Sequence, residues 1–246
     1  MLRTSPTADD PAQPGPPRTG RARRGLMRWL WRGTRWLALR FLALMLALVV
    51  LFGWVVNPPT TWTIITSGPA EVPRKWTRAD DIAPAMLRSV VAAEDANFCA
   101  HWGFDMAEIR RVIARGESRG ASTLTQQTAK NVYLWQGRSW VRKALETVYT
   151  PLIEAVWTKR RILEVYLNVA EFGPGVFGIH AAAAHHFATT PDRLSAAQAA
   201  AIAAVLPAPK SRQARPGWSR AHKIADGAET IRRDGRSACF ERDDAS

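Results

Sequence analysis

One long apolar segment constrains this chain more than any other feature of its sequence. From Trp36 to Val56 the chain reads WLALRFLALMLALVVLFGWVV, and Arg40 is the one charged residue among these 21. An α-helix rises about 1.5 Å per residue, so the segment would span roughly 30 Å, the thickness of the hydrocarbon core of a bilayer. Arg40 lies near one end, where its side chain can reach the interface. The segment therefore predicts a single uncleaved transmembrane anchor, with the remaining residues divided between its two sides.

Arginine residues on the N-terminal side of this segment predict its orientation. The first 40 residues contain nine arginines, eight of them before Trp36, against two aspartates. Because cytoplasmic flanks of transmembrane helices carry an excess of Lys and Arg, we expect the N-terminus in the cytoplasm and the rest of the chain outside it. A cleaved signal peptide would need small residues at its cleavage site, and residues 54–59 (WVVNPP) offer none. Arg23-Arg24 resembles a twin-arginine signal, but arginine pairs are common in an Arg-rich stretch.

The composition predicts one folded domain beside the anchor. A chain of 246 residues, 47% of them apolar, can bury a sizeable core. The net charge of +13 could match nucleic acid, anionic lipid or a phosphorylated substrate. The basic cluster stands directly before the apolar segment, so membrane topology explains it and we expect no nucleic-acid partner. Cys99 and Cys239 could form a disulfide in an oxidising compartment or remain thiols, and two cysteines leave this open.

The pattern after residue 80 is helical. Apolar residues recur at helical spacing, and β-branched alternation is scarce, so the domain should be mainly α. We expect helices to begin at capping residues, and Pro151 to kink one of them. These caps are Asp81, Asp105, Ser122, Ser139 and Ser195. The predicted regions are a disordered basic cytoplasmic tail (1–35), the anchor (36–56), a linker or membrane-proximal segment (57–80), the folded domain (81–218) and a weakly structured C-terminal tail (219–246).

Two carboxylates on separate predicted helices could act on one glycosidic bond. Glu94 ends a helix among apolar neighbours, which would raise its pKa toward the range that a general base needs. Glu146 lies one turn from Arg142 and beside Lys143 on another helix. Paired carboxylates carry out glycosyl transfer, and arginine binds phosphate through two hydrogen bonds. Taken one at a time, these residues are more typical of a solvated helix surface than of a catalytic site.

Residues 122–131 (STLTQQTAKN) are polar around most of a predicted helix. Such a helix fits a core poorly and suits the wall of a groove. Lys130 falls one turn after Gln126, on the same face. His180, His185 and His186 could suggest a metal site, but no acidic partner lies at ligand spacing from them, so we expect no metal site built by the protein.

Four motifs in a fixed order resemble the biosynthetic peptidoglycan glycosyltransferases, also called murein transglycosylases. Residues 94–105 (EDANFCAHWGFD) resemble EDxxFxxHxGxD, and residues 119–131 (RGASTLTQQTAKN) resemble GGSTxTQQxxKN. Residues 142–146 (RKALE) resemble RKxxE, and residues 159–183 resemble the segment built around ILExYLN. The resemblance covers about residues 70–210. No Ser-x-x-Lys acylation motif is present, so the chain resembles the monofunctional branch of the family.

This resemblance implies a lysozyme-like α fold with one N-terminal transmembrane helix at the bacterial inner membrane, its catalytic domain on the periplasmic side. The implied substrates are lipid II and the growing lipid-linked glycan. Glu94 would take the proton from the GlcNAc 4-hydroxyl of the acceptor, and undecaprenyl pyrophosphate would leave with inversion. Glu146 would orient cations or stabilise the transition state. The other motif residues are expected to bind substrate: Asp95, Phe98, His101, Ser122, Thr123, Gln126, Gln127, Lys130, Asn131, Arg142 and Lys143.

The resemblance requires no cofactor, although a divalent cation (Mg²⁺ or Mn²⁺) would suit the pyrophosphate. Expected partners are the bilayer and, as a further hypothesis, other cell-wall synthases or division proteins. Two other functions remain open: a lysozyme-like enzyme that cleaves glycan, and a non-catalytic membrane-anchored scaffold. Cleavage needs no grip on a pyrophosphate, so the cations Lys130, Arg142 and Lys143 argue against it.

Overall fold

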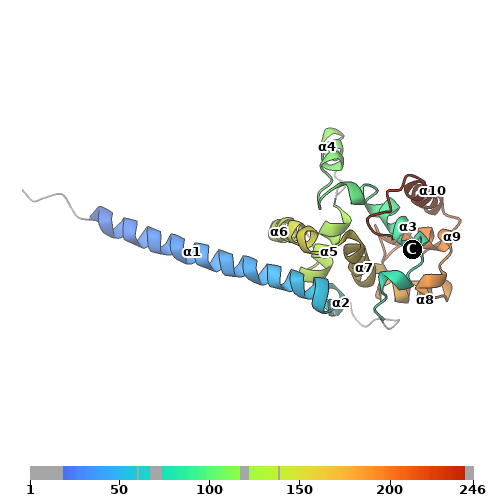
Figure 1. The fold of residues 1–246 in the computed structure, drawn as a ribbon, viewed down its shortest axis with the longest axis horizontal. Coiled ribbons are helices and arrows are strands. Elements are labelled where there is room, and N and C mark those ends of the chain that lie inside the picture. The colour runs from blue at the N-terminus through green and yellow to red at the C-terminus, as the bar shows by residue number, and fades with distance from the viewer. Residues whose placement is uncertain (1–18, 60, 67–73, 117–121, 138, 242–246) are drawn as a thin grey trace, which may run out of the picture. The chain divides into compact units, whose positions relative to one another are not determined.

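The computed structural model describes residues 19–59, 61–66, 74–116, 122–137 and 139–241. The chain divides into two compact units, one ending at Met45 and one beginning at Leu46. The helices, drawn in Figure 1, are α1 (Thr19–Val50), α2 (Trp62–Thr66), α3 (Pro84–Glu94), α4 (Met106–Ala114), α5 (Leu124–Tyr133), α6 (Trp140–Val156), α7 (Lys159–Val169), α8 (Ile179–Phe187), α9 (Ala196–Val205) and α10 (Ser219–Arg233).

Helix α1 contains most of the predicted anchor and passes into a π-helical turn at Leu51–Val55. Among the described residues, Met27–Val55 is the one stretch long and apolar enough to cross a membrane. The predicted disorder of residues 1–35 is wrong from Thr19 onward. Arg, Leu, Met and Trp are adequate helix formers, and no proline stands between Pro17 and Pro58 to stop the helix. Residues 1–18 lie outside the described residues.

The end of the apolar segment docks against the junction of α6 and α7, within the second unit. The indole nitrogen of Trp157 donates to the carbonyl of Val49 at 2.7 Å, and Arg161 Nη2 donates to the carbonyl of Phe52 at 2.7 Å. A Cβ atom at Gly53 would come within 2.5 Å of the Trp157 ring nitrogen. Glycine therefore allows the close approach on which this docking depends.

Part of the predicted linker (57–80) packs onto α7. The Asn168 side chain accepts from the backbone N–H of Thr77 at 2.8 Å, and Glu164 Oε2 accepts from that of Ala79 at 2.9 Å. These two bonds satisfy backbone donors that would otherwise be costly to bury. Residues 74–81 therefore belong to the folded domain, while the membrane-proximal placement of the linker stays a prediction.

Most of the predicted helix starts are confirmed. The side chains of Asp105, Ser139 and Ser195 each accept a hydrogen bond from the backbone N–H three residues later. Each bond satisfies one of the free donors in the first turn of a helix. Pro151 lies inside α6, which continues beyond it to Val156.

Two predicted caps are wrong by one or two residues. Helix α5 is capped by Thr123 and not by Ser122, because Thr123 completes a reciprocal capping box with Gln126. Helix α3 begins after Ala83, since Pro84 supplies the fixed φ of a first helical position. Asp81 instead ends a short 3-10 turn that begins at Ala79.

Two groups of helices form the second unit. Helices α3, α9 and α10 pack on one another, and α5 packs against both α6 and α7, as Figure 1 shows. Helix α4 buries none of its residues and projects from the rest of the unit. A short antiparallel hairpin, β1 (Glu171–Gly173) with β2 (Val176–Phe177), precedes α8 and was not predicted. The expectation of a mainly α domain is confirmed.

The C-terminal tail (219–246) is not weakly structured over its described part. Helix α10 buries Ala221, Ile224, Ala228 and Ile231. These residues follow helical spacing, but the charged residues between them weaken the pattern in the sequence. The chain then continues to Phe240, whose side chain is 1% exposed. Burial against α3 and α9 therefore stabilises a helix that local sequence only hinted at.

Candidate active site

Glu94 is the last residue of α3, and a chain of hydrogen bonds from α5 and α7 orients it. Gln127 Nε2 donates to Glu94 Oε2 at 2.9 Å, and the Tyr166 hydroxyl donates to Gln127 Oε1 at 3.2 Å. Because the amide oxygen of Gln127 accepts from the tyrosine, its nitrogen must face Glu94. Glu94 Oε1 is buried and has no hydrogen-bond partner among the described residues. One oxygen of Glu94 is thus held, and the other can accept a proton.

The surroundings of Glu94 raise its pKa. Burial is the main cause, and the nearby carboxylate of Asp95 adds a smaller increase. The hydrogen bond from Gln127 and the positive charges of Arg220 and Lys130 oppose this rise. A carboxylate with a raised pKa holds a proton more readily, which suits a general base near neutral pH.

Lys130 interacts electrostatically with both predicted catalytic carboxylates. Burial lowers the pKa of Lys130, while the charges of Glu146 and Glu94 raise it. Arg142 and Lys143 are also close enough to lower it further. The Lys130 ammonium has no hydrogen bond or ion pair with the part of the chain that the structure describes. Lys130 therefore lies within electrostatic reach of Glu94, Glu146, Arg142 and Lys143.

Glu146 is engaged by its neighbours on α6. Its side chain is only 4% exposed, with Arg142 Nη1 bonded to one oxygen and Lys143 Nζ 2.9 Å from the other. Lys143 Nζ also donates to the hydroxyl of Ser122 at 3.3 Å. Since both of its oxygens are occupied, Glu146 holds the two cations in place and is not free to move protons. Because Arg142 and Lys143 take both oxygens of Glu146, that carboxylate has no free oxygen to offer a divalent cation.

A cavity of about 500 Å³ lies beside Lys130. Its walls include Gln127, Asn131 and Tyr166, together with the segment Leu206–Ser211. Glu94 and Glu146 are not among its lining residues, but Gln127 connects Glu94 to it directly. The substrate-binding prediction for Gln127, Lys130 and Asn131 therefore has a cavity to support it.

Asp95 ties the loop after α3 to the start of α5. Asp95 Oδ2 accepts from the backbone N–H of Leu124 at 3.0 Å, and Asp95 Oδ1 lies 2.8 Å from His101 Nε2. Both oxygens of this buried carboxylate are thus used inside the protein. We assign Asp95 and His101 to holding the loop that follows Glu94, in place of the substrate contact predicted for them.

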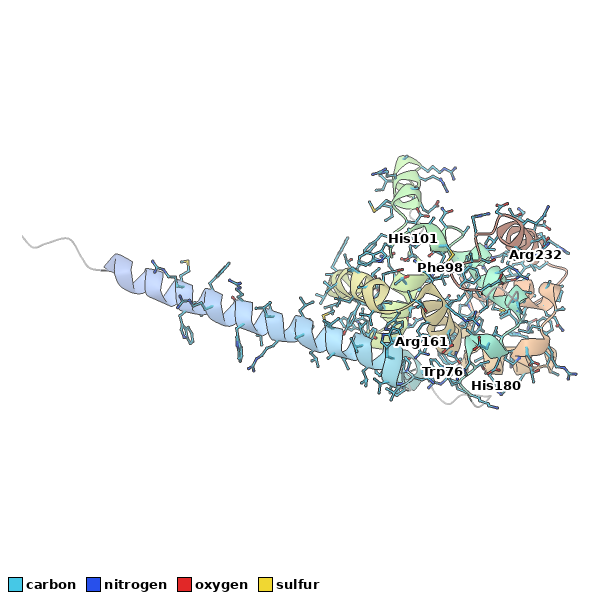
Figure 2. All side chains as sticks on the ribbon, viewed as in Figure 1. Trp76, Phe98, His101, Arg161, His180 and Arg232 are labelled. Carbon is cyan, nitrogen blue, oxygen red and sulfur yellow. A yellow bond between two sulfur atoms is a disulfide. The ribbon has the colours of Figure 1, made fainter. Side chains whose placement is uncertain are left out.

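Three further motif residues are buried in the same way. Phe98 is fully buried, with the Lys159 ammonium 4.4 Å from its ring centroid, and Figure 2 shows it beside His101. The Thr123 hydroxyl donates to the carbonyl of Gly103 at 2.7 Å, and Gln126 completes the capping box of α5. Because these three side chains are buried, they stabilise the structure around the site and do not contact a substrate.

The described residues include one group that could in principle hold a metal ion. Ligand atoms of Asp95, His101 and Asp105 lie within 4.8 Å of one another. Asp105 accepts from the backbone N–H of Glu108 and from the side chain of Asn97, both at 2.9 Å. Since every carboxylate oxygen in this group already accepts a hydrogen bond, the geometry is that of a structural network.

Sequence reasoning missed Arg220 and the cavity wall at Leu206–Ser211, and named no role for Tyr166. Tyr166 lies in the ILEVYLN segment that the motifs did identify, so a signal was present. The two prolines of the cavity wall, Pro207 and Pro209, follow the end of α9, and in the sequence they indicate only where a helix stops. Arg220 lies on α10, where the sequence carried no motif.

Comparison with known proteins decides the family. Residues 62–232 match the transglycosylase family. The chain belongs to the transglycosylase family. The match includes most of α10, which explains why the tail folds with the rest of the domain. It confirms the family resemblance and, with it, the lysozyme-like fold class and the glycosyltransferase class of enzyme that the four motifs predicted.

Similar transglycosylases occur in several bacteria. A biosynthetic peptidoglycan transglycosylase of Jannaschia sp. (strain CCS1) is 54% identical over 220 residues, which cover 87% of this chain and 90% of the relative. Those of Pseudomonas entomophila (strain L48) and Pseudomonas aeruginosa are each 46% identical, over 215 and 206 residues. Both alignments cover 79% of this chain, and 89% and 87% of the respective relatives.

Proposed function

We propose that this transglycosylase polymerises the glycan strands of peptidoglycan from lipid II, with Glu94 as its general base. One observation carries the assignment: Gln127 fixes one oxygen of Glu94 and leaves the other free, near the half-buried, positively charged Lys130. Membership of the family and the names of the relatives support polymerisation in cell-wall synthesis. The residue roles below are part of the proposal.

The reaction joins an acceptor hydroxyl to the anomeric carbon of the lipid-linked chain. Glu94 Oε1 takes the proton from the GlcNAc 4-hydroxyl of lipid II as that oxygen forms a bond to C1 of the donor MurNAc. The bond from C1 to the pyrophosphate oxygen breaks on the opposite face, so the configuration inverts. Undecaprenyl pyrophosphate leaves with the electron pair. Glu94 keeps the proton until solvent removes it.

The cations beside Glu94 suit the departing pyrophosphate. Lys130 lines the cavity, and its ammonium has no hydrogen-bond partner among the described residues, so it can meet an incoming phosphate oxygen. Arg142 and Lys143 are held in place by Glu146. Cations fixed before the reaction stabilise charge that develops in the transition state without a cost of reorientation. A divalent cation stays a hypothesis, and none of these steps depends on one.

The membrane is the proposed location of both substrates and enzyme. The apolar stretch Met27–Val55 is consistent with membrane anchoring, and arginines on its N-terminal side favour a cytoplasmic N-terminus. The disulfide between Cys99 and Cys239 supports an oxidising, extracytoplasmic compartment for the catalytic domain. Trp140, 91% exposed, stands two residues before Arg142 and suits the headgroup region of a bilayer. Partner synthases and division proteins stay predictions.

The pH dependence of the rate should have two limbs. Glu94 acts without its proton, and burial raises its pKa, so the acidic limb should lie above about pH 4.3, the ordinary value for glutamate. Lys130 acts with its proton, and burial lowers its pKa, so the alkaline limb should lie below about pH 10.4. We expect kcat/KM for lipid II to form a bell between these limits. A profile without an acidic limb would contradict the role of Glu94.

The direct test uses the full chain in detergent with labelled lipid II. We expect a ladder of glycan polymer on a gel, released undecaprenyl pyrophosphate, and digestion of the polymer by a muramidase. Isolated sacculi form the matched second substrate. Cleavage of sacculi without any polymer from lipid II would favour the glycan-cleaving alternative. Binding of glycan without turnover of either substrate would favour the scaffold.

A further inference from the structure

The segment that follows α10 runs along the loop that follows Glu94. We call residues 236–241 the C-terminal strap and residues 95–101 the catalytic loop. The strap meets the loop at three places, and none of its residues lines the cavity beside Lys130. Its effect on the site must therefore act through the loop and the helices that it contacts.

A hydrogen bond from a side chain to a backbone carbonyl and a disulfide join the strap to the loop. Arg236 Nη1 donates to the carbonyl of Ala96 at 3.1 Å, two residues after Glu94. Cys239 is bonded to Cys99, with 5.7 Å between their Cα atoms. This bond links residues 140 positions apart, so it fixes the tail to the motif that contains the proposed base.

Packing and two charged contacts hold the strap against the helices beside the loop. Phe240 is 1% exposed, and its ring centroid lies 6.4 Å from that of Phe98, which Figure 2 labels. The carbonyl of Phe240 accepts from Arg160 Nη1 at 2.6 Å. Glu241 Oε1 lies 2.6 Å from Arg88 Nη1, on the same helix that Glu94 ends.

We propose that the C-terminal strap is a positioning element for Glu94, and that the Cys99–Cys239 disulfide makes full polymerase activity depend on oxidation. The inference rests on the proposed function of Glu94. Strap residues touch neither the substrate nor Glu94 itself. They bond to the loop at Ala96 and Cys99. Within the loop, Asp95 bonds to His101 and to the start of α5.

The position of the catalytic loop affects the rate because a general base must lie within hydrogen-bond distance of the proton that it removes. Glu94 must bring one oxygen to hydrogen-bond distance of an acceptor hydroxyl, and a displacement of about 1 Å can lower a rate roughly 10²-fold. The catalytic loop has only one 3-10 turn, Phe98–Ala100, as regular structure. Reduction of the disulfide takes two electrons and two protons and yields two thiols. The covalent tie at Cys99 is then lost, and the loop gains freedom directly after Glu94.

The experiment compares oxidised and reduced full-length enzyme in detergent. Dithiothreitol supplies the electrons and protons and becomes a cyclic disulfide, after which iodoacetamide blocks the thiols. We expect kcat for lipid II to fall about tenfold while KM changes less than about twofold, because the loss is one of alignment and not of binding. In a parallel sample left unblocked, reoxidation should restore the rate. A reduced enzyme with unchanged kcat would overturn the proposal.

Two variants keep the test independent of folding. The double change Cys99→Ser with Cys239→Ser should have the low rate of the reduced enzyme and should not respond to dithiothreitol. Arg236→Met leaves the disulfide intact and removes the bond to Ala96, so we expect a smaller fall in kcat, again at nearly constant KM. Arg233→Met, an exposed neighbour on α10, is the matched control and should keep the full rate. If Arg236→Met and Arg233→Met have equal rates, the strap does not position the loop.

Amide hydrogen exchange separates a local change from unfolding. In reduced protein we expect faster exchange in residues 95–101, with the amides of α9 unchanged. Unchanged exchange in the loop would also overturn the proposal. The failure of the proposed function has a different signature, because oxidised wild-type enzyme would then make no polymer at all. Oxidised enzyme that polymerises, with no effect of reduction, overturns the strap alone.

Discussion

Glu94→Gln is expected to lower the rate of lipid II polymerisation by about 10²–10⁴-fold, the usual loss when a general base is removed. The substituted amide has nearly the shape of the carboxylate, and its carbonyl can still accept the hydrogen bond from Gln127 Nε2. The fold should therefore persist, and only the ability to take a proton is lost. Initial rates of lipid II consumption, measured below saturation and at saturation, would quantify the effect.

The split between kcat and KM tests the assigned role. Proton transfer occurs in the transition state, so kcat and kcat/KM should fall together while KM stays nearly constant. Glu229→Gln is a matched control, because Glu229 lies on α10 in an ion pair with Arg232 and outside the site. This control should keep the wild-type rate. Should Glu94→Gln polymerise lipid II as fast as the control, Glu94 is not the base.

Lys130→Met should lower kcat by about 10²–10³-fold, the usual cost of losing one preorganised group that stabilises transition-state charge. Lys130 lines the cavity, burial lowers the pKa of its ammonium, and that ammonium has no hydrogen-bond partner among the described residues. Methionine has a similar length without the charge. Lys223→Met, an exposed site on α10, provides the matched control. Single-turnover rates at saturating lipid II would report the chemical step.

The same substitution carries a second readout in the pH profile. The positive charge of Lys130 lowers the pKa of Glu94, so removing that charge should raise it. A higher pKa keeps the proton on Glu94 up to a higher pH, and the acidic limb of the profile should move in that direction. Loss of rate without this shift would show that Lys130 acts on the leaving group alone. An unchanged rate would remove Lys130 from the mechanism.

The sequence determined those features that depend on neighbouring residues. The apolar run from Trp36 to Val56 predicted a helix long enough for a membrane because hydrophobicity and length are local properties. Capping side chains such as Asp105 and Ser139 predicted where helices begin, since a cap reaches only three residues along the chain. The error at Ser122 was one residue, because the neighbouring Thr123 makes the cap. The error at Asp81 was two residues, because Pro84 sets the start of α3 after Ala83, which has no capping side chain.

The four motifs also determined the family, and with it the residues that meet in space. Nothing local requires Glu94 and Glu146 to approach the same lysine. Lys130 on α5 is near Glu146 because α5 packs against α6, and it is near Glu94 because Gln127, also on α5, bonds to Glu94. The resemblance carried this information, because a family motif records a tertiary arrangement that periodicity does not.

Tertiary structure alone decided the fate of the C-terminal tail and the division of labour among motif residues. Helix α10 forms because Ile224 and Ile231 are buried against other helices. Its many charged residues make the apolar pattern of this helix hard to recognise in the sequence. Pairing of Cys99 with Cys239 requires two distant segments to meet, which spacing cannot reveal. Asp95 and Gln127 are both polar motif residues, and the sequence does not distinguish their roles. In the fold, Asp95 is buried within a structural hydrogen-bond network, whereas Gln127 lines the cavity. Burial and long-range contact depend on the whole packed chain, and this is the physical reason that the sequence could not supply them.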